Sequence, residues 1–180
     1  MTILDEYGLP DLTMRRLAAA LEGQPSALYW HFPNKQTLLA ELSDRIVAEV
    51  HSGPADLEWT SRVRAEASAL RRALLAHRDG AELVASTFAL GLGSRTAHDR
   101  LAAAIATGGF DDESVQRSTA ALLHFVLGHV LHEQQRQQHR ELGVHGDAPP
   151  AAGQDDAPEA GFAFGVDLLV GGLQFRRAGV

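Results

Sequence analysis

The sequence predicts an all-α fold in two parts, residues 1–51 and residues 52–180. Apolar residues recur every three or four positions, as in Leu38, Leu42 and Ile46, and this spacing marks one face of a helix. Glycine and proline clusters separate the periodic stretches, and side chains that can cap a helix precede several of them. With 180 residues, the chain can bury a substantial core in one large or two small domains.

The composition narrows the class of protein further. Hydrophobic residues make up 45% of the chain and charged residues 22%, which is ordinary for a globular domain. There is no cysteine, which excludes disulfides and thiolate metal sites. Because no signal peptide and no apolar run of membrane-spanning length occurs, we expect a cytoplasmic protein with no membrane partner.

The first elements after residue 8 predict a helix-turn-helix. Thr13 is a good N-cap for a helix over 14–21, and a three-residue turn with a glycine follows. Pro25 suits the first turn of a second helix, and Pro33 forces this helix to end near His31. Two such helices form the motif that places a recognition helix in a groove of DNA.

Three consecutive rings, Tyr29, Trp30 and His31, lie on the second helix. Neighbouring residues fan around a helix axis, so at least one of these rings must face outward. We expect Leu28 and Phe32 to pack inward. A short helix that presents aromatic and hydrogen-bonding groups has the composition of a recognition helix, although Tyr29 and Trp30 could also cover neighbouring helices.

The charge balance argues against a DNA-binding surface. The net charge is −7, and residues 1–50 hold seven acidic residues against four basic ones. A DNA-binding domain is usually basic. Three of the four basic residues, Arg15, Arg16 and Lys35, flank the predicted recognition helix, so we expect a local cationic surface there.

The rest of the chain is predicted to form helices with a loop over 141–161, which is rich in Gly, Pro, Ala and Asp. The predicted helices run from a cap at Asn34 to near His51, from Trp59 to His77 with Gly80 as a C-terminal stop, from Glu82 to Leu90, from a cap at Thr96 to Ile105, from a cap at Asp111 to about Gln138, and from Phe162 to Arg177.

The last two predicted helices carry apolar residues all around their axes. Gly165, Gly171 and Gly172 would each cost about 1 kcal/mol relative to alanine unless another backbone approaches closely. We therefore predict a symmetric homodimer in which these helices form a four-helix bundle.

Several motifs together resemble the TetR family of transcriptional regulators. "LTMRRLAAAL", "LYWHF" and "NKQTLL" resemble its DNA-binding domain, while "ALLAHRDGAEL", "GGF", "HFVLGHVLHEQ" and "FAFGVDLLVGGL" resemble the regulatory core of its tetracycline-repressor subgroup. The resemblance implies a DNA-binding domain over 1–51, an effector-binding and dimerisation domain over 52–180, and a repressor that a small ligand releases from a palindromic operator. The family has a full first helix before the position of Gly8, and here only Met1 to Tyr7 remain. The expectation is either a start codon assigned too late or a chain that lacks most of this helix.

The predicted DNA contacts follow from the motif and the resemblance. Side chains expected near bases are Arg15, Tyr29, Trp30 and His31, and those expected near phosphates are Thr13, Ser26 and Lys35.

The resemblance also implies an effector pocket. His51 matches a drug-contacting histidine, although a histidine that interacts with a helix dipole is an equal alternative. Val84 replaces the family's metal-binding histidine, so we do not expect a Mg²⁺-tetracycline complex, and this repressor type remains the alternative. We expect a bulky aromatic or antibiotic-like ligand and no cofactor. The predicted lining is His51, Glu66, Leu70, Val84, Phe88, Leu101, His124, Phe125 and His132.

Two rival hypotheses were weighed. One is a helical metal-dependent enzyme, because His129 and Glu133 stand one turn apart among further histidines, His124, His132 and His139. No zincin HExxH pattern occurs, so we expect neither an enzyme nor a metal site. The other is a ligand-binding or scaffold protein that has lost DNA binding together with its first helix.

Overall fold

The computed structural model describes residues 1–50, 57–93, 95–143 and 158–178. Within these ranges the regular structure is helical, with no strand, as the sequence predicted. The helices are α1 (Thr2–Tyr7), α2 (Met14–Ala20), α3 (Pro25–His31), α4 (Lys35–Ala48), α5 (Trp59–Leu75), α6 (Gly80–Ala89), α7 (Thr96–Ala106), α8 (Asp112–Glu141) and α9 (Pro158–Arg177).

Three predicted caps are confirmed. The side-chain oxygen of Thr13 accepts a hydrogen bond from the Arg16 N–H at 3.2 Å, and Asn34 does the same for Thr37 at 2.9 Å. The Asp111 carboxylate accepts from the Ser114 N–H at 2.9 Å. These bonds satisfy amides that a helix start leaves without an intrahelical partner, and the same bonds at Asp111 lower the pKa of its carboxyl.

Other predicted boundaries were wrong. Gly80 does not stop α5, which ends at Leu75; it begins α6, where a side chain's Cβ would lie 2.4 Å from the Leu74 carbonyl oxygen. Thr96 is the first residue of α7 and not its cap. The last helix begins one turn before Phe162, at Pro158, because proline fits the first position of a helix.

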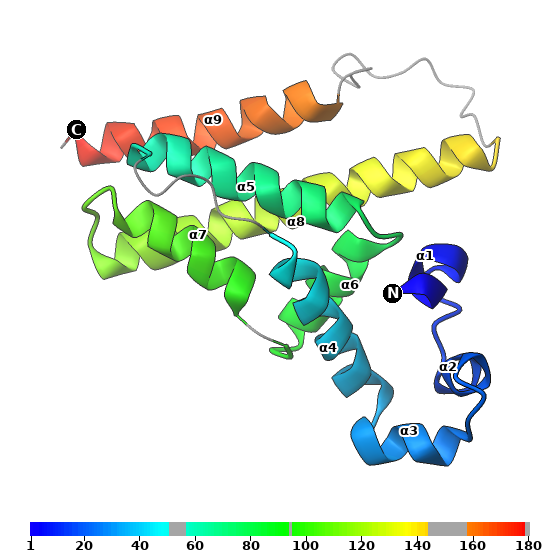
Figure 1. Cartoon of the computed structure of the whole chain (residues 1–180). Helices are drawn as coiled ribbons and strands as arrows, with labels where there is room; N and C mark the ends of the chain where they lie inside the picture. The colour runs from blue at the N-terminus through cyan, green and yellow to red at the C-terminus, as the bar shows by residue number, and fades with distance from the viewer. Residues whose placement is uncertain (51–56, 94, 144–157, 179–180) are drawn as a thin grey trace.

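The chain folds into a small head and a larger core, joined by α4 (Figure 1). We call residues 1–34, with α1 to α3, the head, and the described residues from 57 onward, with α5 to α9, the core. In the core, α5, α8 and α9 pack on one another and α7 packs on α5 and α8. Helix α4 packs on α6, α7 and α5, so it anchors the head to three core helices.

Helix α4 buries one face, with Leu38, Leu42, Ile46 and Val47 at its centre. The predicted boundary between residues 51 and 52 lies outside the described residues. Across the described ranges, no helix combines the length and apolarity needed to cross a bilayer.

Helices α8 and α9 use their apolar residues differently. The α8 residues Leu122, Val126 and Val130 are buried inside the chain's own core. On α9, by contrast, Phe164, Leu168 and Phe175 are 66%, 61% and 61% exposed. The remaining apolar surface is therefore mainly on α9.

Candidate DNA interface and effector site

The recognition helix expected from the sequence is α3. Pro25 occupies its first turn, and the backbone leaves the helical region at Phe32, before Pro33, as predicted. No residue of α3 is buried. Leu28 and Phe32 are half-buried and pack against the hydrophobic core, so the inward-facing pair is also as predicted.

The aromatic side chains of α3 point into solvent. Trp30 is 89% exposed and Tyr29 is 50% exposed, and His31 is exposed too. Ser26 and Arg15 are exposed, while Lys35 is half-buried at the start of α4. Because α2 packs on α3, the structure gathers the predicted DNA-contacting residues on adjoining helices, with Thr13 at the start of α2.

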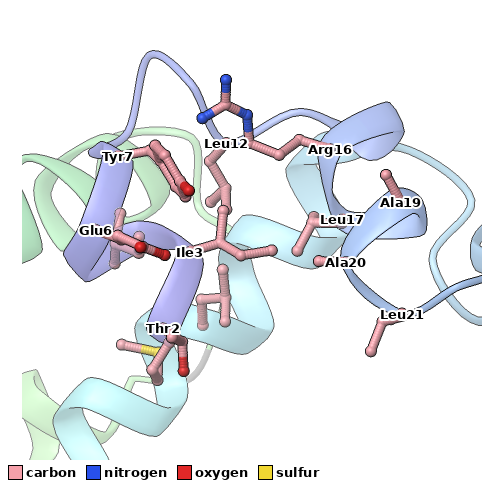
Figure 2. A pocket seen from close by; sticks show the side chains of 13 residues that line it. Thr2, Ile3, Glu6, Tyr7, Leu12, Arg16, Leu17, Ala19, Ala20 and Leu21 are labelled. Carbon is pink, nitrogen blue, oxygen red and sulfur yellow. The ribbon is translucent and has the colours of Figure 1, made fainter.

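An open cavity of about 650 Å³ separates α1 from α2 above α4 (Figure 2). Its apolar lining includes Ile3, Leu12 and Leu17. Across its rim, the Arg16 guanidinium lies 4.3 Å from the centre of the Tyr7 ring. The side chains of α1 and α2 therefore leave open space between them in the head.

The head is held on the core by a polar junction at the α5–α6 turn. The Leu9 N–H donates to Asp79 Oδ2 at 2.8 Å, and the Gln138 amide donates to the other Asp79 oxygen. His77 Nδ1 lies 3.0 Å from Asp5 Oδ1. Asp79 adopts a left-handed backbone conformation (φ 55°) at this turn. Sequence reasoning missed these residues, although His77 and Asp79 lie in a motif that carried the family resemblance.

Two residues of the predicted effector set line a small cavity between α4, α6, α7 and α8. These are Val84 and Phe88, joined there by Ser43, Thr87 and others. The Thr87 hydroxyl donates to the Ser43 hydroxyl at 3.0 Å inside this buried region. The cavity measures about 10 Å³, which is room for about one water molecule.

The polar and apolar residues predicted from α5 and α7 are already in contact with protein. Glu66 is buried, and its Oε2 accepts two hydrogen bonds from Arg100 at 2.8 and 3.0 Å. Leu70 and Leu101 are buried in the hydrophobic core at 2% and 1% exposure. None of these three residues lines the small cavity.

The α8 residues of the predicted set lie in different surroundings. His124 and His132 are both exposed. The His124 ring packs edge-on against Phe88, with 6.3 Å between the ring centres. Phe125 stacks on Phe162 of α9 at 5.7 Å. His51 lies outside the described residues. In this conformation the described members of the predicted set are thus divided among several places and do not enclose one pocket.

Two candidate metal ligands of α8, Glu133 and His129, contact polar groups of the protein. Arg71 donates to both Glu133 oxygens at 2.6 and 3.0 Å, and His129 Nε2 lies 3.3 Å from the Pro158 carbonyl oxygen. Burial lowers the pKa of His129. Among the described residues, no three side chains of the metal-binding types come together. The geometry gives the metalloenzyme hypothesis no support.

Comparisons with known proteins agree with the architecture. The family model "Bacterial regulatory proteins, tetR family" matches residues 1–42, and "Tetracyclin repressor-like, C-terminal domain" matches residues 53–176. The tetracycline repressor protein class E of Escherichia coli is 35% identical in an alignment 182 positions long, and this alignment covers 96% of this chain and 86% of the relative.

Two crystal structures of BioQ are similar throughout. Mycobacterium smegmatis BioQ has a TM-score of 0.84 at 40% identity, with 96% of this chain and 91% of BioQ covered. BioQ with its natural double-stranded DNA operator has a TM-score of 0.79 at 39% identity, with the same coverage.

Proposed function

Because this chain belongs to the tetR family of bacterial regulatory proteins, as its motifs predicted, we propose that it represses transcription as a homodimer with α3 of each protomer in a major groove. It is a ligand-responsive, DNA-binding repressor. The finer statements concern which residues contact DNA, how the dimer forms and which ligand binds. They follow from the surfaces described above.

The exposure of Trp30 and Tyr29 is the observation that supports α3 as the reading element. Exposed rings on a seven-residue helix contribute little to the fold, whereas they offer stacking and hydrogen-bonding groups to a groove. Tyr29, Trp30, His31 and Arg15 would lie near bases. Thr13, Ser26 and Lys35 would lie near phosphates and fix the register of the helix.

The head offers few cations to the phosphate backbone. Arg16 is paired with Asp11 at 3.2 Å, and Arg45 is paired with Glu41 at 3.0 Å. Of the four basic residues in 1–50, Lys35 is then the principal candidate for a charged phosphate contact, since Arg15 is assigned to bases. With one such contact per protomer, a dimer's log affinity should fall with log salt with a slope of about −2.

The dimer would form through α9 and the neighbouring surface of α8. Phe164, Leu168 and Phe175 are large exposed apolar residues at spacings that fit one helix surface. Gly171 and Gly172 have open space beside their Cα atoms, which leaves room for close approach of a second helix. Gly165 differs, because the ring of Phe125 in the same chain fills the space beside it.

The effector would enter between α4, α6, α7 and α8, where Val84 and Phe88 lie with Ser43. Since the cavity there is nearly closed, a bulky ligand must displace α4, and α4 carries the head. Ligand binding would thus favour a different head orientation, and this differential affinity would release the DNA. Val84 has no metal-binding group, which favours an aromatic ligand without Mg²⁺ over a Mg²⁺-tetracycline complex.

The test is a titration of labelled DNA from around this gene, followed by fluorescence anisotropy. We expect Tyr29→Ala and Trp30→Ala to weaken specific binding at least about tenfold, which is the loss of one good base contact. Leu142→Ala removes an equally exposed apolar side chain far from α3 and serves as the control. Unchanged DNA affinity in both α3 variants, with the dimer intact, would refute the assignment of α3.

A further inference from the structure

His77 lies between two carboxylates that belong to different parts of the DNA-binding half of the chain. Its Nδ1 is 3.0 Å from Asp5 Oδ1 on α1, and its Nε2 is 3.3 Å from Glu49 Oε2 at the C-terminal cap of α4. The His77 side chain is only 12% exposed. One ring from the core thus contacts both the head and the helix that carries it.

The chemistry of this arrangement depends on the proton count of the ring. A carboxylate can only accept hydrogen bonds, and a neutral imidazole has a single N–H to donate. Both contacts are therefore satisfied at once only when the ring is an imidazolium with two N–H groups. A neutral ring would leave one carboxylate facing a nitrogen lone pair.

The charged neighbours of the ring, Arg78 and Glu141, do not bridge the two carboxylates as the His77 ring does. The Arg78 guanidinium donates to the Glu6 carbonyl oxygen at 3.4 Å, and the Arg78 N–H donates to Asp5 Oδ1 at 3.3 Å. On α8, Glu141 lines the same small cleft as the ring and adds negative charge. The imidazolium is thus the group that offers an N–H to Asp5 and to Glu49 together.

The backbone that carries His77 is fixed to the core. The Gln134 amide on α8 donates to the His77 carbonyl oxygen at 2.7 Å and to the Leu74 carbonyl oxygen at 3.1 Å. Its own carbonyl oxygen accepts from the Ala81 N–H at 3.0 Å. Because Gln134 is buried, the turn is a rigid support for the ring.

We propose that His77 is a positioning residue whose protonated ring clamps α1 and the end of α4 against the core. The inference rests on the proposed function, in which the placement of the two α3 helices decides operator binding. Helix α4 also carries Ser43, which bonds Thr87 beside the effector cavity. A shift of α4 by ligand would pull Glu49 from the ring and so release the clamp.

The experiment uses the absence of cysteine in the chain. Gln36→Cys places one spin label at an exposed position at the start of α4, next to the head of each protomer, and pulsed electron paramagnetic resonance measures the distance between the two labels of the dimer. We expect a narrow distance distribution for the unmodified chain at about pH 6 and a broad one for His77→Gln, because glutamine cannot donate to two carboxylates on opposite sides.

The matched control is His139→Gln, which removes an exposed histidine of α8 and should leave the distance distribution narrow. Asp5→Asn should broaden the distribution, and adding His77→Gln to it should broaden it no further. A His77→Gln protein with a distribution as narrow as that of the unmodified chain would overturn the proposal. A thermal melt of each variant confirms that the core remains folded.

A second readout separates failure of the clamp from failure of the dimer. If the labels show no coupling because the chain is monomeric, the proposed dimer is wrong, and the clamp is tested by hydrogen exchange over residues 1–12. There His77→Gln should exchange about tenfold faster than the unmodified chain at about pH 6, which corresponds to one lost charge-assisted hydrogen bond. Equal exchange rates would refute the clamp independently of the oligomeric state.

Discussion

The head and the core differ in how closely their side chains pack. In the core, Val63, Val126 and Val130 are fully buried, and the ring of Phe125 fills the space beside Gly165. In the head, α3 buries no residue and an open cavity lies between α1 and α2. The core is therefore a stable support, whereas the position of the head depends on α4 and on the junction at the α5–α6 turn.

Truncating one leucine in each region should give the largest difference in the free energy of unfolding between core and head. Leu74 is fully buried in the core, so Leu74→Ala should lower the free energy of unfolding by about 3 kcal/mol through lost burial and a new cavity. Leu17 already borders the open cavity of the head, so Leu17→Ala should cost under about 1 kcal/mol. Urea denaturation of both variants measures the difference, and equal losses would show that the head is packed as tightly as the core.

A pair of glycine substitutions also compares the packing of the core with that of the head. In the core, Gly80→Ala places a Cβ 2.4 Å from the Leu74 carbonyl oxygen, so the free energy of unfolding should fall by about 2 kcal/mol. In the head, Gly23→Ala meets only ordinary contacts near 3.8 Å, so stability should stay within about 0.5 kcal/mol of the original value. Thermal unfolding of the two variants checks this, and a neutral Gly80→Ala would contradict the close packing of the turn.

The sequence could predict the features of the head and the core that depend on neighbouring residues, but not those that depend on residues far apart in the chain. Thr13, Pro25 and Pro33 act on their immediate neighbours, so the helix-turn-helix was predicted with nearly correct limits. The junction joins Leu9 to Asp79 across 70 positions, and no local pattern reports such a contact. Gly80 was misassigned because a glycine can end a helix or allow a close approach, and only the fold distinguishes the two.

The geometry of the effector site could not be predicted from the sequence for the same reason. The family resemblance assigned its residues one position at a time, but the state of the cavity depends on how four helices pack. Glu66 appeared as an orienting polar group, and in the structure it bonds to Arg100. Which of the predicted residues touch the ligand remains a prediction for the open conformation.

Filling the head cavity should have a smaller, stabilising effect. Ala20 lines the cavity, so Ala20→Leu adds apolar surface where space exists and should raise the free energy of unfolding by about 1 kcal/mol. Ala48→Leu makes the same change at an exposed site of α4 and should have little effect. Denaturation midpoints compare the two, and a loss of stability in Ala20→Leu would show that the cavity closes in solution.

Acidification should lower the stability of the core slightly. Burial between Phe125 and Phe162 lowers the pKa of His129, so below the unfolded value of about 6.5 the unfolded chain binds a proton that the folded chain does not. Stability from this residue is therefore present above that pH and declines below it. His129→Phe should reduce the loss of core stability between about pH 7 and pH 5, as measured by urea denaturation, with His139→Gln as the exposed control. A variant as acid-sensitive as the original chain would show that protonation of His129 is not linked to folding.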